Sequence, residues 1–276
     1  MKSTYASVVA VLATLSGVAV ANSAIDGALF HDDDGYGPGH AAAMSSTPMW
    51  HFGRPLGQNP CYPEAAETNG RQTDGNSPDS GINPSRGCAD PGPWTGQNSQ
   101  GNPFPVYYTI KQCSANDMRI GYSIYFKHDS GHKSDWENVI VKWSKPDESV
   151  NNWTRVEALL GFHGKWKSYG WNDIQNTVDG WADLMTQDKK GANHPKVYVG
   201  AWGHAVFHDR YTPLSTWNAL APRKEFRSND WYWFPDDGSV QPGTLIKDEW
   251  EWGQADTNPA TLRTWRDICA ASNNAW

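Results

Sequence analysis

Four side chains that suit metal binding lie within a short stretch of this 276-residue chain: Asp129, His132, Asp135 and Glu137. Asp135 and Glu137 are two positions apart, so on an extended chain both leave the same face, with Cα atoms roughly 7 Å apart. Three carboxylates this close would raise one another's pKa unless a cation joined them. Oxygen-rich sites favour Ca²⁺ or Mg²⁺, and His132 would then hold a water molecule near the ion. The spacing indicates a divalent-cation site, with a solvated acidic loop as the alternative.

Two segments with period-two alternation flank these residues. Apolar side chains recur at positions 120, 122, 124 and 126 before them, and at positions 139, 141 and 143 after them. Such alternation is typical of half-buried strands. The acidic residues are therefore expected to lie where a loop joins two neighbouring strands.

The same segment resembles a known family. Residues 131–137 (GHKSDWE) resemble the GHRHDWE heptapeptide of the necrosis- and ethylene-inducing-peptide-like proteins, the NLP cytolysins. Residues 122–129 (YSIYFKHD) resemble the family's Tyr-Ser-Trp-Tyr-Phe-Pro-Lys-Asp segment. Lys133 and Ser134 stand where the heptapeptide has Arg and His, and the loop before it is shorter. The resemblance implies a β-sandwich with a divalent cation bound at one end, near an acidic cavity.

The resemblance also implies roles for single residues. It assigns four of them to the metal site: Asp129, His132, Asp135 and Glu137. His163 resembles the histidine of a His-Gly step in the family and would line the cation cavity. His204 resembles the histidine of a later His-Ala step in the family. Either His204 or His208 could lie near the site or have a structural role.

The first 21 residues have the features of a secretory signal peptide. Lys2 precedes an apolar run over residues 6–20, and residues 19–21 form an A-x-A cleavage site. No other stretch approaches the ~18 apolar residues of a membrane span. We expect a secreted, extracellular protein without a transmembrane segment. Residues 22–57 are expected to form a mobile N-terminal arm, and residues 58–276 one NLP-like β-sandwich domain.

Composition narrows the range of partners. The formal net charge is −7 and becomes −8 when Lys2 is removed with the signal peptide. A negative chain argues against nucleic acid and against simple attraction to anionic lipid. It fits the capture of a cation or of a neutral sugar headgroup. The many tryptophans and tyrosines suit a large core, and such rings also stack on sugars. We expect a monomer.

Together with the resemblance, the periodic segments predict a mainly β protein, an antiparallel β-sandwich with a few peripheral α-helices. Further strands are expected at residues 104–110, 154–160 and 196–202. One amphipathic helix is expected over residues 176–189. A second begins where Asn258 caps the chain and Pro259 takes the first helical position. One face of this helix is expected to pack against the sandwich: Leu262, Trp265, Ile268 and Cys269.

Four cysteines in a secreted chain indicate two disulfides, for which three pairings are possible. Cys61–Cys88 is the local choice, and its surroundings resemble a cysteine pair of the family; Cys113–Cys269 is the pair that remains. Asn152 begins an Asn-Trp-Thr sequon and is expected to accept a glycan at a loop edge.

The leading functional hypothesis rests on the resemblance. It implies a fungal or oomycete effector, a non-enzymatic cytolysin that engages glycosylinositol phosphorylceramide sphingolipids and damages the plant plasma membrane. Asp129 and Asp135 would ligate the cation, while Glu137 and His132 would order its waters. A relative that keeps the fold but has lost toxicity is a subcase. The alternatives are a secreted metal-dependent hydrolase with Glu137 or Asp135 as general base and a calcium-dependent lectin.

Overall fold

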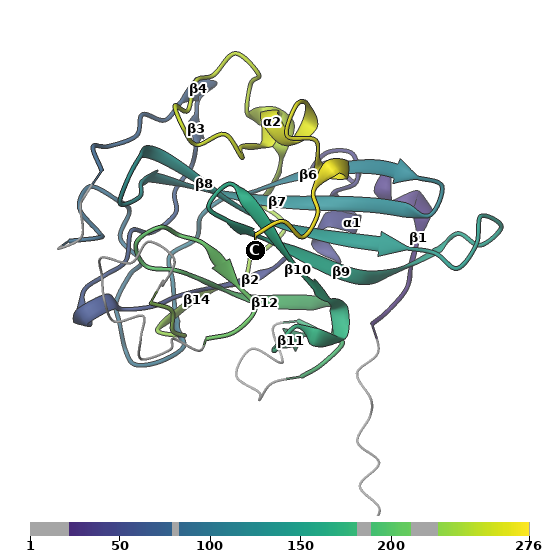
Figure 1. The fold of residues 1–276 in the computed structure, drawn as a ribbon, viewed down its shortest axis with the longest axis horizontal. Helices are drawn as coiled ribbons and strands as arrows, with labels where there is room; N and C mark the ends of the chain where they lie inside the picture. The colour runs from purple at the N-terminus through teal and green to yellow at the C-terminus, as the bar shows by residue number, and fades with distance from the viewer. Residues whose placement is uncertain (1–21, 79–82, 181–188, 211–225, 276) are drawn as a thin grey trace, which may run out of the picture.

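A computed structural model describes residues 22–78, 83–180, 189–210 and 226–275 of the chain (Figure 1). The expected signal peptide, residues 1–21, lies outside the described residues. Most described strands belong to two sheets that pack face to face. Among the described residues, no helix is long and apolar enough to cross a membrane.

The larger sheet has seven strands and is built around a long hairpin. β7 (Asp117–His128) and β8 (Lys133–Ser144) pair over their whole length, from Asp117 opposite Ser144 to His128 opposite Lys133. Two strands extend the sheet beyond β8: β9 (Asn152–Phe162) and then β1 (Ile25–Asp26), with β10 (Lys165–Gly170) also on β9. Two extend it beyond β7: β6 (Val106–Ser114) and then β15 (Val240–Pro242).

The second sheet has six strands. Its order is β11 (Thr177–Val178), β12 (His194–Val199), β2 (Met49–Phe52), β14 (Trp231–Trp233) and β5 (Ser99–Gln100), with β13 (Val206–Phe207) also on β12. A separate hairpin consists of β3 (Glu67–Thr68) and β4 (Arg71–Gln72).

The pairs β2–β12, β5–β14 and β6–β15 are parallel. The sheets are therefore mixed rather than purely antiparallel, because these strands come from distant segments that no hairpin joins.

The core lies between the two sheets. From the larger sheet, the predicted alternating side chains of β7 and β8 point inward, including Tyr122 and Val141; from the smaller sheet, Trp50, Val197 and Trp231 meet them. All five are buried. The expected mainly β architecture of two packed sheets is thus confirmed.

Helical elements are short and peripheral. Within the described residues, the α-helices are α1 (His40–Met44) and α2 (Pro259–Arg263). The described part of the chain also contains the 3-10 turns η1 (Gly27–Phe30), η2 (Pro55–Gly57), η3 (Trp171–Asp173), η6 (Gly243–Leu245) and η7 (Ile268–Ala270). The prediction of a helix over residues 176–189 is wrong in the part that the structure describes, because Thr177–Val178 is a strand paired with β12. Residues 181–188 lie outside the described part.

Residues 22–57 are packed into the sandwich, so the expectation of a mobile arm is corrected. β1 pairs with β9, and β2 lies between β12 and β14 with all of its residues buried. The physical reason is the apolar run at β2, whose Trp50 and Phe52 enter the main core. Burial of large aromatic side chains offsets the entropy of ordering this segment.

The C-terminal segment follows the predicted cap. The side chain of Asn258 accepts hydrogen bonds from the backbone N–H groups of Ala260 and Thr261, and Pro259 opens α2. However, α2 ends at Arg263, so the expected packing face is interrupted. Leu262 and Ile268 are buried, whereas the side chain of Trp265 is 66% exposed.

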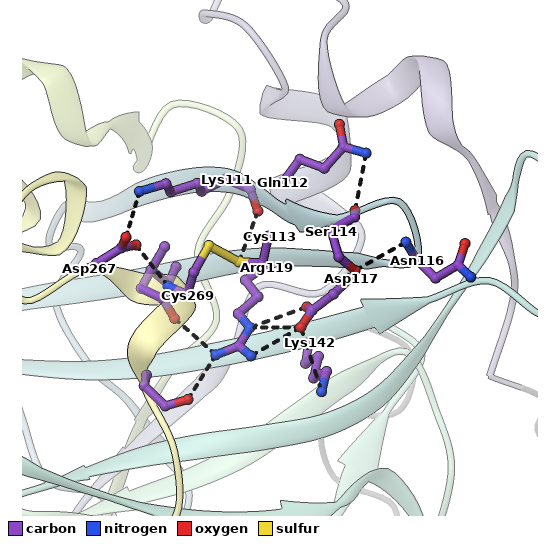
Figure 2. The surroundings of a disulfide bond; sticks show 12 residues. Lys111, Gln112, Cys113, Ser114, Asn116, Asp117, Arg119, Lys142, Asp267 and Cys269 are labelled. Carbon is purple, nitrogen blue, oxygen red and sulfur yellow. Dashed lines mark hydrogen bonds and ion pairs between the residues drawn. A yellow bond between two sulfur atoms is a disulfide. The ribbon is translucent and has the colours of Figure 1, made fainter. Parts of the chain in front are cut away.

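Both disulfides join the cysteines that were expected to pair. Cys61 is bonded to Cys88, and Cys113 to Cys269. Figure 2 shows the second bond between the end of β6 and the C-terminal segment, beside an ion pair of Lys111 with Asp267 at 2.8 Å. The C-terminal segment is therefore fixed covalently and ionically to the larger sheet.

Candidate metal centre

The turn between β7 and β8 orients the first acidic side chain. One carboxylate oxygen of Asp129 accepts hydrogen bonds from the backbone N–H groups of Gly131, at 2.7 Å, and His132. The other lies 3.0 Å from Nδ1 of the His132 ring. Asp129 is buried and the ring of His132 is partly exposed. The turn thus presents a fixed carboxylate with a histidine beside it.

Asp135 and Glu137 continue the inward face of β8. They share the alternation of Val139 and Val141, which lie in the main core. Both acidic side chains are buried although they lie near the end of the strand. Burial of a carboxylate is unfavourable unless the carboxylate is paired or binds a metal. Both side chains are therefore expected to have a hydrogen-bonding, charged or metal partner.

His204 supplies one such partner from the other sheet. Its Nδ1 atom lies 2.8 Å from a carboxylate oxygen of Asp135, and its ring stacks on Phe126 with centroids 4.0 Å apart. His204 lies in the loop after β12, where its φ of 55° belongs to the left-handed region. The backbone N–H of Ser130 also donates to the carbonyl of Trp202 in this loop, at 2.9 Å. The two loops therefore form one end of the sandwich.

A cavity of about 270 Å³ opens at this end. All five residues that sequence analysis assigned to the site line it: Asp129, His132, Asp135, Glu137 and His163. A further part of the wall comes from the C-terminal segment, chiefly Gln254, Asp256 and Arg266. Arg266 holds this wall in place, because its guanidinium pairs with Asp256 and donates to the carbonyl of Gly164 at 3.1 Å.

The donor set suits a hard cation. Asp129, His132 and Asp135 can each offer one atom such that all three atoms lie within 4.8 Å of one another. Carboxylate oxygens are the ligands that Ca²⁺ and Mg²⁺ prefer. Glu137 lines the same cavity but does not belong to this group of three. The residues present thus fit a divalent cation.

The other candidate residues lie as follows. His163 is exposed at the turn between β9 and β10, with its ring edge-on to Phe162. His208 lies against Tyr169 and beside Asp209 instead of entering the cavity. Asn152, the expected glycan acceptor, is exposed where β9 begins. The C-terminal wall was missed by sequence analysis, although the expected anchoring of Cys269 pointed to this segment.

Ser134, which stands where the heptapeptide has histidine, lies directly beneath another backbone segment. It is buried with a φ of 75°, and its hydroxyl lies 3.2 Å from that of Tyr125. The backbone at Gly75 covers it so closely that a Cβ atom added to Gly75 would come within 2.3 Å of the Ser134 hydroxyl. Ser134 and the segment around Gly75 are therefore in close contact.

Fold and site together define a β-sandwich with an acidic pocket at one end. The family model described as "Necrosis inducing protein (NPP1)" matches residues 55–236, about two thirds of the sequence. The chain belongs to this family of necrosis-inducing effectors.

The individual proteins that resemble this chain share less than a third of its residues in the aligned regions. NLP effector protein 2 of Phytophthora capsici is 29% identical over 188 residues, which cover 65% of this chain and 68% of that protein. Among solved structures, the non-toxic HaNLP3 protein is similar with 17% identity and a TM-score of 0.49, over 94% of this chain and 99% of that one. NLPPya in complex with mannosamine is similar with 17% identity and a TM-score of 0.49, over 84% and 89%.

Proposed function

We propose that this protein is a secreted effector of the necrosis-inducing type that binds Mg²⁺ or Ca²⁺ in the acidic pocket and uses the ion to engage a sugar headgroup at the plant plasma membrane. The proposed lipids are glycosylinositol phosphorylceramides. One observation carries the proposal: buried Asp129 and Asp135 converge with His132 on a single cavity. A bound cation would compensate the negative charge of two buried carboxylates that have one histidine partner each, His132 and His204.

Each residue has a proposed role. Asp129 and Asp135 ligate the ion, and His204 orients Asp135 by its hydrogen bond. Glu137 and His132 order water molecules around the ion, and His163 borders the place where a sugar would enter. The ion would supply a positive centre for hydroxyl or phosphate oxygens of the headgroup. We infer binding without turnover, so this protein acts as a lytic effector rather than an enzyme.

Leakage of a dye from vesicles that contain glycosylinositol phosphorylceramide tests this proposal. We expect leakage by the wild type that stops with a chelator and in Asp135→Ala. Asp147→Ala is the matched control, because Asp147 is exposed in the turn at the opposite end of β8. No leakage from folded, metal-loaded protein would contradict the lytic proposal. Sugar binding without leakage would indicate a lectin, and product release that Glu137→Gln abolishes would indicate a hydrolase.

A further inference from the structure

Trp265 is the most exposed of the large hydrophobic side chains among the described residues. Its side chain is 66% exposed, although Leu262 and Ile268 on either side of it are buried. The exposed indole of Trp265 therefore lacks the favourable free energy that burial of apolar surface gives to its two neighbours. Single exposed hydrophobic residues are common on proteins, so its surroundings decide whether this one has a role.

The surroundings connect Trp265 to the acidic pocket. The guanidinium carbon of Arg266 lies 5.0 Å from the centre of the Trp265 ring. The same guanidinium pairs with Asp256, bonds to the carbonyl of Gly164 and lines the cavity. The ring therefore lies at the rim of the cavity, beside the part of its wall that Arg266 and Asp256 form.

This rim is held rigidly. Immediately after Arg266, Asp267 pairs with Lys111 and Cys269 is bonded to Cys113 (Figure 2). Arg119 on β7 donates to the carbonyls of Ile268 and Ala271, at 3.0 and 2.8 Å. A ring whose backbone is already fixed loses little entropy when it binds a ligand.

The chemistry of the rim matches a sugar ring. An exposed indole offers an apolar face to the C–H face of a hexose. The neighbouring wall offers hydrogen-bonding groups for its hydroxyls, namely the carboxylate of Asp256, the amide of Gln254 and the hydroxyl of Thr257. Hydrocarbon chains would instead have to desolvate the Arg266–Asp256 pair, which is unfavourable.

We propose that Trp265, Arg266 and Asp256 form a sugar-stacking subsite at the rim of the acidic pocket, distinct from the cation ligands. It takes a second sugar ring of a glycan whose first ring is held at the cation. This subsite rests on the proposed function, because the cation site supplies the first contact. The glycan can belong to a lipid headgroup or to a free oligosaccharide, since both present the same ring.

Binding measurements with matched variants test the subsite. We compare Trp265→Ala, the conservative variant Trp265→Tyr, and Tyr36→Ala, which removes a 51% exposed ring from the N-terminal segment. The probes are vesicles that contain glycosylinositol phosphorylceramide, vesicles of sphingomyelin, and the free headgroup oligosaccharide. Metal affinity is measured by calorimetry on each variant.

We expect Trp265→Ala to weaken binding of the glycolipid vesicles and of the free oligosaccharide by about three- to tenfold, as loss of one stacked ring implies. Trp265→Tyr should restore most of the affinity, and Tyr36→Ala should match the wild type. Metal affinity should not change in any of them. Weakening with the vesicles alone, glycolipid and sphingomyelin alike, would overturn the subsite in favour of a general membrane contact.

The subsite and the proposed function fail in different ways. If Asp135→Ala and the chelator abolish glycan binding while Trp265→Ala has no effect, the subsite is wrong and the cation-dependent function stands. If glycan binding survives the chelator but falls in Trp265→Ala, the stacking contact stands and the cation-dependent function is wrong.

Discussion

The Nδ1 atom of His204 lies 2.8 Å from the carboxylate of Asp135 and joins the two sheets at the pocket. Asp135 belongs to β8 in the larger sheet, whereas His204 follows β12 in the smaller one. Both side chains are buried, and the His204 ring rests on Phe126. A histidine in this position fixes the orientation of a proposed metal ligand.

We predict that His204→Ala lowers the affinity for Ca²⁺ or Mg²⁺ by about 10- to 100-fold, the usual cost of losing a group that orients a metal ligand. His204→Asn should lose less, since asparagine tolerates the left-handed backbone and its amide can still donate. His208→Ala is the control, because His208 lies beside Asp209 instead of Asp135. Calorimetric titration checks these values, and unchanged affinity in His204→Ala would refute the orienting role.

The close contact between Gly75 and Ser134 gives a prediction for stability. Gly75→Ala places a Cβ atom against the Ser134 hydroxyl and the carbonyl of Lys127, so we expect a loss of about 1–3 kcal/mol in the free energy of unfolding. Gly238→Ala is the control, because the added Cβ atom would meet only Asp236, at 3.9 Å. Urea unfolding measures both. Equal stabilities would mean that the segment over Ser134 shifts at little cost to make room for the added Cβ atom.

Much of the site could be predicted from the sequence because it lies in one hairpin. Asp129, His132, Asp135 and Glu137 are close along the chain, and strand periodicity puts Asp135 and Glu137 on one face. His163 was identified only through the family resemblance, since a single histidine after a strand has no distinctive spacing. The structure places all five on one cavity.

The remainder of the pocket depends on contacts between distant segments. Asp256 and Arg266 reach it through the path of the C-terminal segment, which no local pattern encodes. Trp265 was expected on a buried face because helical periodicity was extended beyond Arg263, where α2 ends. The burial of β2 was missed because the acidic and glycine-rich residues before it dominate the composition of that region.

The two disulfides should differ in their effect on stability. Cys113–Cys269 spans 156 residues and Cys61–Cys88 spans 27. The chain-entropy relation gives about 5 kcal/mol for the longer loop and about 3.5 kcal/mol for the shorter one. We therefore expect Cys113→Ser/Cys269→Ser to lose more stability in urea than Cys61→Ser/Cys88→Ser. The reverse order would show that local contacts of the first pair outweigh loop length.

Two buried histidines of the smaller sheet predict acid sensitivity. Burial lowers the pKa of His51 to about 3 and that of His194 to about 4. Since both values lie below the ~6.5 of an unfolded histidine, the unfolded chain binds the protons first. The free energy of unfolding should therefore fall as the pH drops from about 6.5, by about 2 kcal/mol per histidine at pH 5.

Unfolding by urea between pH 5 and 7 checks this slope. His194→Gln keeps a donor for the carbonyl of Thr47 but cannot titrate, so it should lose about half of the pH dependence that these two residues contribute. A slope in His194→Gln identical to that of the wild type would mean that His194 does not bind a proton on unfolding in this range.

Direct titration of Ca²⁺ and Mg²⁺ into chelator-treated protein tests the central claim, that Asp129 and Asp135 hold a divalent cation. Calorimetry of the wild type, of Asp147→Asn and of the double variant Asp129→Asn/Asp135→Asn is sufficient. We predict one saturable site in the first two proteins and none in the double variant, provided that its circular dichroism shows it folded. Absence of binding in the wild type, or undiminished binding in the folded double variant, would contradict the assignment of the pocket.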